Sequence, residues 1–339
     1  MPRKTKQVRI TSPEKMARIN KSNMRLKDDF LMYLRSVQRS DGTIDGYASD
    51  LEIFFTYVLD ELGNKDFQKL TKRDIIAFQN WLVSNDTSSA RIRRLKSAIS
   101  SLSNYCELIL VDDDPDFKDY KPIVRKIENP PLTPVREKTI WTDKELTGLL
   151  DELTKRGDWQ KACYVALAMY GGRRKAELCR FRVSDFSDDR VVCDGALYKS
   201  APILTKGNKY LECYTLKKKF DPYLRAWLKY REENNIESEW LFPKADNPDE
   251  HVEISTVNSW ANTFSRITGK DWYAHSLRHF FVSALSAAGI PDGVVVEIMG
   301  WSSSEMFKIY DDNPKDERIA MYFKDGDIDT SRTKSIDTL

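Results

Sequence analysis

A change of character near the middle of the chain constrains the fold more than any other feature. Residues 24–110 read as helices separated by short polar breaks, whereas residues 111–140 pass through an acidic run, 112–114, and then a segment with three prolines, 130–134. Because proline resists helix, this stretch predicts a connection between two folded units. The 339 residues are enough for two domains that each bury a core. We therefore expect a basic tail at 1–22, a helical domain at 23–115, a linker at 116–140, a second domain at 141–325 and a tail at 326–339.

Apolar residues at helical spacing predict the helices of the first domain. The stretch 43–62 places six of them on one face, namely Tyr47, Leu51, Phe54, Phe55, Val58 and Leu59. Further helices are expected at 72–83 and from about residue 87. The last of these has an apolar stripe, with Arg93, Arg94 and Ser97 on the opposite side. One face of this helix should pack, and the other is available for a ligand.

The second domain has mixed character. A helix is expected from Thr142, because Thr142 and Glu145 have the spacing of a capping box, and helical segments follow at 159–181, at 221–233 and from 254. Strand-like stretches at 196–205 and 210–216 are separated by a Lys-Gly-Asn-Lys segment, which predicts a hairpin. The fold class is therefore mainly α with a small β-sheet.

Composition excludes several classes of protein. No window approaches the ~18 uninterrupted apolar residues of a membrane helix, and the N-terminus lacks the apolar core of a secretory signal. We expect a cytoplasmic protein without a membrane partner. The five cysteines form no close pair and there are only three histidines. Neither a disulfide framework nor a metal site is expected.

Basic residues gather in two places although the net charge is only +2. Residues 1–27 hold nine Lys or Arg against the single acid Glu14. A second cluster comprises Arg91, Arg93, Arg94 and Lys96. Both groups can contact phosphates, and the alternative is that they are solvated surface charge.

Two short segments carry arginines suited to phosphoryl transfer without a metal. That reaction needs fixed positive charge around the non-bridging oxygens, and the planar, permanently charged guanidinium supplies it. Arg174 and Glu177 are neighbours on a helix, although an ordinary salt bridge would also explain them. His275 and Arg278 share one side of a helix, so both can address one phosphate. A capped helix start with a buried histidine is the alternative at that segment.

A tyrosine follows these segments and is a candidate nucleophile. Tyr310 lies nine residues after Trp301, and Ser302 with Glu305 predicts a capping box that begins a short helix carrying the tyrosine. A phenol with its usual pKa of ~10 needs neighbours that remove its proton or stabilise its anion. Without such neighbours, Tyr310 would be one of 15 tyrosines with a packing role.

Together these segments resemble the tyrosine recombinase or integrase family. The order and approximate spacing match for Arg174 with Glu177, Lys206-Gly207-Asn208-Lys209, His275-Ser276-Leu277-Arg278-His279, Met299-Gly300-Trp301 and Tyr310. The predicted helix at 43–62 is also similar to the N-terminal core-binding domain of that family. The resemblance implies a two-domain clamp on double-stranded DNA, built from a helical core-binding domain and an α+β catalytic domain.

The resemblance also implies roles for individual residues. Tyr310 would attack the scissile phosphate to give a 3′-phosphotyrosine and a free 5′-hydroxyl, without metal, ATP or another cofactor. The implied catalytic residues are Arg174, Lys206, His275, Arg278, Trp301 and Tyr310, with Glu177 and His279 beside them. Lys209 is the rival of Lys206 for protonating the leaving oxygen.

Two positions depart from the family pattern. Histidine often stands where this chain has Trp301, although some members use tryptophan, whose N–H can still donate to a phosphate. Arg173 occupies a position that is commonly apolar, which indicates either a DNA contact or altered packing. The DNA-binding residues expected from charge and position are Arg91, Arg93, Arg94, Lys96, Arg173 and Lys209.

By the same resemblance, the working assembly would be a homo-tetramer on two DNA duplexes. A helix around 319–323 would dock on a neighbouring protomer, or alternatively pack on its own domain. Integration and excision of a mobile element is the expected role, with resolution of replicon dimers and DNA inversion as alternatives. A type IB topoisomerase is the rival enzyme, and an inactive DNA-binding protein of the same fold is the rival of another class.

Overall fold

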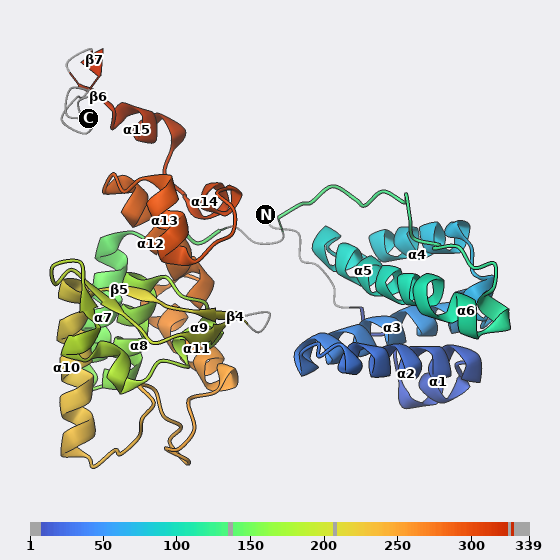
Figure 1. Ribbon diagram of the computed structural model, residues 1–339, viewed down its shortest axis with the longest axis horizontal. Helices are drawn as coiled ribbons and strands as arrows, with labels where there is room; N and C mark the ends of the chain where they lie inside the picture. Colours follow the sequence, from blue (N-terminus) through green and yellow to red (C-terminus); the bar gives the residue numbers. More distant parts are fainter. Residues whose placement is uncertain (1–7, 135–137, 206–208, 325–326, 329–339) are drawn as a thin grey trace. The chain divides into compact units, whose positions relative to one another are not determined.

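The computed structural model describes residues 8–134, 138–205, 209–324 and 327–328 of the chain. The chain divides into two compact units, Met1–Glu137 and Lys138–Leu339, which are drawn in Figure 1. Separate clusters of buried apolar residues fill them, so each unit has its own core. The predicted two-domain organisation and the mainly α fold class are confirmed.

The first unit is a helical bundle. The helix predicted at 43–62 is α3, and its side chains Phe54, Phe55 and Val58 are completely buried. Helix α4 begins with a capping box between Thr71 and Asp74, and α5 carries the apolar stripe expected from the sequence. The elements are α1 (Pro13–Arg18), α2 (Lys21–Ser36), α3 (Asp41–Glu61), η1 (Phe67–Lys69), α4 (Lys72–Ser84), α5 (Ser89–Tyr105), the π-helix η2 (Cys106–Leu110), α6 (Val111–Asp113) and η3 (Pro115–Phe117).

Much of the segment expected to be a linker packs on the first unit. Phe117, Ile123 and Val124 are buried in its core. Further along, the backbone N–H of Thr133 donates to Ser89 Oγ at 3.0 Å. The prolines end regular helix, but the apolar side chains before them are still buried in the core of the first unit. The structure therefore carries the first unit well beyond residue 115.

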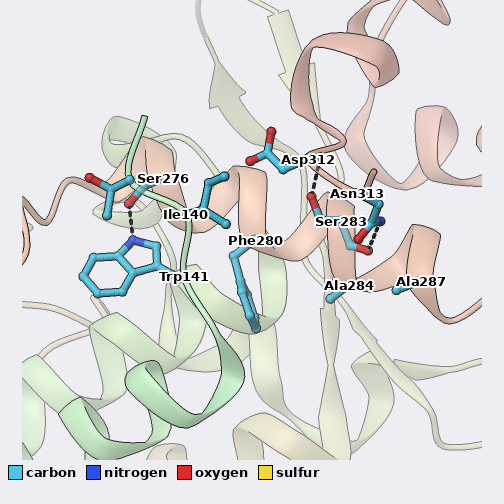
Figure 2. Close-up of a pocket in the computed structure, with 10 residues that line it drawn as sticks. Ile140, Trp141, Ser276, Phe280, Ser283, Ala284, Ala287, Asp312 and Asn313 are labelled. Atoms are coloured by element: carbon cyan, nitrogen blue, oxygen red, sulfur yellow. Dashed lines mark hydrogen bonds between the residues drawn. The ribbon is translucent and has the colours of Figure 1, made fainter. Parts of the chain in front are cut away.

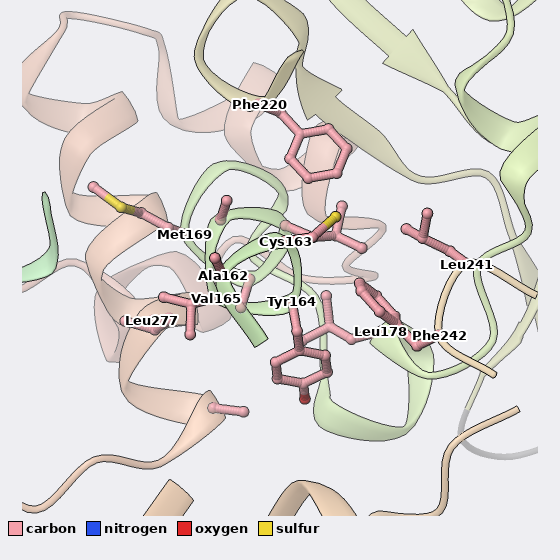
Figure 3. Packing of buried hydrophobic residues seen from close by; sticks show 14 of the residues in the cluster. Ala162, Cys163, Tyr164, Val165, Met169, Leu178, Phe220, Leu241, Phe242 and Leu277 are labelled. Carbon is pink, nitrogen blue, oxygen red and sulfur yellow. The ribbon is translucent and has the colours of Figure 1, made fainter. Parts of the chain in front are cut away.

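The second unit is built around helix α8 (Trp159–Gly171), which packs against α7 (Asp143–Lys155), α10 (Lys217–Glu233) and α12 (Ala274–Ala287). Eight of its residues from Ala162 to Met169 are buried in succession, because neighbours surround it. Figure 3 shows Phe220, Phe242 and Leu277 lying around this helix. The capping box predicted at Thr142 and Glu145 is present at the start of α7.

Short strands form two small sheets beside these helices. The three-stranded sheet has the order β1 (Val191–Val192), β2 (Leu197–Lys199), β5 (Tyr214–Leu216). The predicted hairpin is confirmed as β3 (Ile203–Thr205) paired with β4 (Lys209–Leu211), in which Thr205 faces Lys209. Its tip, with Lys206, lies outside the described residues.

The remaining elements are α9 (Lys175–Leu178), η4 (Val183–Phe186), η5 (Asp188–Arg190), α11 (Ile254–Thr268), α13 (Asp292–Met299), α14 (Glu305–Tyr310), α15 (Lys315–Ala320), β6 (Phe323–Lys324) and β7 (Asp327–Ile328). Helix α14 carries Tyr310 as expected, but the capping box predicted for it is wrong. The helix begins at Glu305 after Ser304, so Glu305 is its first residue and cannot reach back from the third position. Across the described ranges, no helix combines the length and apolar character needed to cross a bilayer.

Candidate active site

Side chains from two separate segments, α12 and the turn after α13, converge around Tyr310. Its hydroxyl oxygen lies 3.0 Å from Nε2 of His275, which comes from the start of α12. The Trp301 ring, from the turn after α13, stacks on the phenol with centroids 5.0 Å apart. The guanidinium carbon of Arg278 lies 5.3 Å from the centre of the Tyr310 ring. Tyr310 is thus buried, with 5% of its surface exposed, among the groups that the sequence picked out.

Arg174 occupies the turn that joins α8 to α9. Its backbone N–H donates to Glu177 Oε2 at 3.0 Å, and its Nη1 donates to Glu177 Oε1 at 2.8 Å. Glu177 is buried, whereas 37% of the Arg174 side chain is exposed. One carboxylate therefore fixes both the backbone and the guanidinium of Arg174, and the open part of that guanidinium can meet an anion.

Arg278 is completely buried on α12. Its Nη1 donates to the carbonyl oxygen of Gly172 at 3.0 Å, which ties α12 to the C-terminal end of α8. Gly172 has φ +61°, and a Cβ atom there would lie 2.4 Å from the Phe281 ring. Glycine thus permits both the left-handed conformation and the close approach of the two helices.

The guanidinium of Arg278 has donors left over. Its Nε and Nη2, together with Nε1 of Trp301, are buried without a hydrogen-bond partner among the described residues. Burial, followed by repulsion from Arg174 and Arg173, lowers the pKa of Arg278 to about 10, so it still carries a proton at neutral pH. Buried donors in a native protein nearly always have a partner. Those beside Tyr310 suit an oxyanion such as a phosphate.

His275 is held in its neutral form. Burial and then repulsion from His279 and Arg278 lower the pKa of His275 to about 4. A neutral imidazole has one nitrogen that can accept a proton. With Nε2 as that nitrogen, His275 accepts the hydrogen bond of Tyr310 and is placed to take its proton.

A second layer fixes the backbone of Tyr310. The carbonyl oxygen of Tyr310 lies 3.2 Å from Nδ1 of His279 and accepts a hydrogen bond from Ser283 Oγ at 3.4 Å. Asp312 forms an ion pair with Lys138 and lies 3.5 Å from Nδ1 of His279. The sequence marked His279, but Asp312, Ser283 and Lys138 were missed because lone polar residues carry no recognisable spacing.

A pocket of ≈ 190 Å³ lies along one side of α12 and is lined in part by Asp312 and Ser283. Figure 2 shows the residues that line it. The backbone N–H of Asp312 donates to Ser283 Oγ at 2.8 Å, and Asn313 Nδ2 donates to the Ser283 carbonyl at 2.8 Å. Trp141 Nε1 donates to Ser276 Oγ at 2.7 Å. The chain that follows Tyr310 is thus attached to α12 directly after the tyrosine.

Two of the residues expected to contact DNA have interior positions, so the DNA contact expected of each is corrected, and the alternative of altered packing agrees with the burial of Arg173. Lys96 is buried, and its Nζ donates to Gln79 Oε1 at 2.6 Å and to the carbonyls of Ile127 and Glu128. Arg173 is completely buried and its Nη2 donates to the Ile298 carbonyl at 2.5 Å. Both side chains form hydrogen bonds inside the protein and are not accessible to DNA.

The other expected DNA contacts lie on or near the surface. Arg91 and Arg94 share the buried carboxylate of Asp50, and 59% of the Arg94 side chain is exposed. Arg93 Nη2 donates to the Pro130 carbonyl at 2.9 Å. Lys209 is exposed on β4. Within the described ranges, no group of three or more His, Cys, Asp or Glu side chains is arranged to hold a metal ion.

Comparison with known proteins identifies the family. Residues 140–317 match the phage integrase family, and residues 28–107 match the N-terminal SAM-like domain of phage integrases. The two matches fall in the two units of the structure. The chain therefore belongs to the phage integrase family and is a tyrosine recombinase.

Relatives in sequence have consistent names. The SPbeta prophage-derived recombinase-like protein YomM of Bacillus subtilis is 30% identical over 228 residues, which are 66% of each chain. A tyrosine recombinase of Thermosipho africanus is 25% identical over 294 residues, covering 83% of this chain and 92% of the relative.

Solved structures share the fold. One of them is XerH site-specific recombinase bound to palindromic difH substrate, in a post-cleavage complex. Its TM-score is 0.66 at 17% sequence identity, and the match spans 94% of this chain and 90% of the XerH chain. A lambda integrase tetramer bound to a Holliday junction has a TM-score of 0.61 at 15% identity. That match spans 87% of this chain and 77% of the lambda integrase chain.

Proposed function

We propose that this chain is a site-specific DNA recombinase that cleaves and rejoins DNA through a 3′-phosphotyrosine at Tyr310. The observation that carries the proposal is the hydrogen bond between Tyr310 and neutral His275, beside buried Arg278 and Trp301 donors that no described residue satisfies. A packing tyrosine would need neither a proton acceptor nor a guanidinium over its ring.

In the proposed cleavage step, the Tyr310 oxygen attacks the scissile phosphorus as its proton passes to His275. The bond from phosphorus to the 5′ oxygen breaks, and that oxygen takes a proton from the hairpin lysine, Lys206. Arg174 and Arg278 bind the non-bridging oxygens, where negative charge grows, and Trp301 Nε1 donates to one of them. One phosphodiester is exchanged for another, so rejoining is the same step in reverse and needs neither ATP nor a redox partner.

DNA would be held by exposed basic groups of both units. Arg91 and Arg94 are oriented by Asp50, and Lys209 lies on β4, three positions after Lys206 in the sequence. Fixed arginines lose little side-chain entropy when they meet a phosphate, which favours them over freely moving lysines.

We further propose a homo-tetramer on two duplexes, with the C-terminal segment docking on a neighbouring protomer. Ile319 and Tyr322 are each 47% exposed in and after α15, and such apolar groups on a terminal helix suit a protein partner. Deleting residues 316–339 should reduce strand exchange more than DNA binding by a single protomer. Equal loss in both assays would reject the docking role.

Integration and excision of a mobile element is the role proposed for the reaction. A prophage-derived relative at 30% identity supports it. Resolution of replicon dimers and DNA inversion are the alternatives. Sequencing the products formed in cells between two copies of a recovered target would distinguish these outcomes.

The test of the chemistry compares native protein with Tyr310→Phe. A pool of nicked duplexes with a randomised central region is incubated with each protein, and DNA that stays bound after denaturation is recovered and sequenced. The nick lets a short fragment leave, so a cleaved strand cannot rejoin. Native protein should give covalently bound DNA of a common sequence, and Tyr310→Phe should give none. Specific DNA binding without any adduct would instead indicate an inactive DNA-binding protein.

A further inference from the structure

Arg173 is a buried cation whose guanidinium is only partly hydrogen-bonded by the described residues. None of its surface is exposed, and its Nε and Nη1 have no hydrogen-bond partner among the described residues. Among the described residues, its guanidinium makes a single hydrogen bond, from Nη2 to the Ile298 carbonyl at 2.5 Å. No carboxylate within the described part of the chain forms an ion pair with it. An unpaired buried charge is costly, so a position that retains one calls for a functional reason.

Arg173 stands in the sequence between two residues of the candidate site, and its charge acts on a third. Gly172, its chain neighbour, accepts the hydrogen bond of Arg278, and Arg174 follows on the other side. Repulsion from Arg173 is also among the causes that lower the pKa of Arg278. The positive charges of Arg173 and Arg174 thus both act on Arg278, and Glu177 is the carboxylate that binds Arg174. Positive charge is in excess where the reaction gathers negative charge.

We infer that Arg173 is a positioning residue of the proposed reaction, which holds unneutralised positive charge beside Arg174 and Arg278 and does not itself contact the phosphate. Charge built into a water-poor site needs no reorganisation when the oxyanion forms, so its effect falls on the transition state. The inference rests on the proposed recombinase chemistry.

A structural explanation makes a different prediction. The bond to Ile298 joins the start of α9 to the end of α13, just before Gly300 and Trp301. If this bond were the purpose of Arg173, a neutral donor would serve, and loss of the side chain would destabilise the protein. If charge is the purpose, an apolar side chain of similar length should be neutral or stabilising for the fold while it slows cleavage.

The test uses Arg173→Met, Arg173→Gln and Arg173→Lys in the full chain. The probe is a suicide duplex recovered with native protein from the randomised pool, and its affinity, single-turnover cleavage rate and the protein's Tm are measured. We expect Arg173→Met and Arg173→Gln to cleave roughly 10- to 100-fold more slowly at unchanged affinity. Arg173→Lys should recover most of the rate, and the Tm of Arg173→Met should stay level or rise.

Arg231 provides the matched control, since it is also a buried arginine of the second unit. Its guanidinium donates to the carbonyls of Ser238, Trp240 and Leu241, so its role is to hold these backbone segments in place. Arg231→Met should lower Tm and leave the cleavage rate per folded molecule unchanged.

Several results would overturn the inference and leave the proposed function intact. They are native-like cleavage by Arg173→Met, near-native cleavage by Arg173→Gln with poor cleavage by Arg173→Lys, or a fall in Tm for Arg173→Met as large as that for Arg231→Met. Failure of the proposed function looks different, because native protein would then form no adduct that depends on Tyr310.

Discussion

The hydroxyl of Tyr310 and Nε2 of His275 lie 3.0 Å apart, on two helices of the same unit of a single chain. The backbone of Tyr310 is held in turn by His279 and Ser283 of α12. The proposed nucleophile therefore lies beside Arg278 of its own chain. No exchange of segments between protomers is needed to bring the phenol to this guanidinium group.

The protonation of His275 gives the first prediction. Because burial and neighbouring positive charge lower its pKa to about 4, His275 should remain neutral throughout the range in which an ordinary histidine, with a pKa of about 6.5, takes up a proton. The chain has only three histidines, so NMR of histidine-labelled protein can follow each one. His275→Asn identifies the resonance. A His275 that titrates near pH 6.5 would contradict the expected environment.

The same shift makes stability depend on pH. Between about pH 6.5 and 4 the unfolded chain binds a proton at His275 that the folded chain does not. The free energy of unfolding should therefore fall as pH is lowered through this window, and this part of its pH dependence should be absent in His275→Asn. Urea unfolding of both proteins at a series of pH values measures the difference. Parallel curves would show that His275 does not contribute.

Glu177 is expected to support both stability and cleavage. Glu177→Ala removes the acceptor of the Arg174 N–H and of its guanidinium, so we expect a loss of roughly 1–3 kcal/mol in unfolding free energy and a cleavage rate at least about tenfold lower. Glu177→Gln keeps one amide oxygen as an acceptor and should lose less of both. Equal activity of Glu177→Ala and native protein would show that Arg174 needs no such orientation.

Much of the site could be predicted from the sequence because its members come in short segments with fixed spacing. His275 and Arg278 lie three residues apart on one helix, and Arg174 and Glu177 lie three apart across a helix start. Such local geometry follows from helical periodicity. The meeting of these segments with Tyr310 could not be derived that way, and came from resemblance to a family.

The remaining misses concern groups whose partners are distant in sequence. Lys96 and Arg173 were expected to contact DNA, because nothing local shows that backbone carbonyls 31 and 125 positions away accept their hydrogen bonds. The predicted cap at Ser302 failed for a local reason, since three consecutive serines offer three possible starts for one short helix. Phe117, Ile123 and Val124 are apolar but follow no helical period, so periodicity could not predict their burial.

Gly300 should prove intolerant of any side chain. It has φ +64°, and a Cβ atom would lie 2.4 Å from Leu211 on β4. Gly300→Ala should therefore lower the unfolding free energy by more than the ~1 kcal/mol of a strained backbone alone. It should also slow cleavage, because Trp301 is the next residue. In a double-mutant cycle, Leu211→Ala should recover the part due to the clash. Strictly additive effects would show that the contact does not matter.

Substitution of Lys96 distinguishes a structural lysine from a DNA-binding one. Its ammonium donates to Gln79 and to the carbonyls of Ile127 and Glu128, so Lys96→Met should cost about 1–3 kcal/mol of unfolding free energy by leaving polar partners unsatisfied. Arg125→Met is the control, because its ion pair with Glu107 is exposed and should be worth less than about 1 kcal/mol.

The two roles of Lys96 also differ in salt dependence. A lysine that binds a phosphate displaces counterions from the DNA. Its loss therefore makes the negative slope of log affinity against log salt shallower by about one. Because Lys96 is buried in its own unit, Lys96→Met should leave that slope unchanged when binding is measured on the recovered duplex at several salt concentrations. Arg94→Met, which removes an exposed guanidinium, should make it shallower. A shallower slope for Lys96→Met with unchanged stability would return Lys96 to the DNA-binding surface.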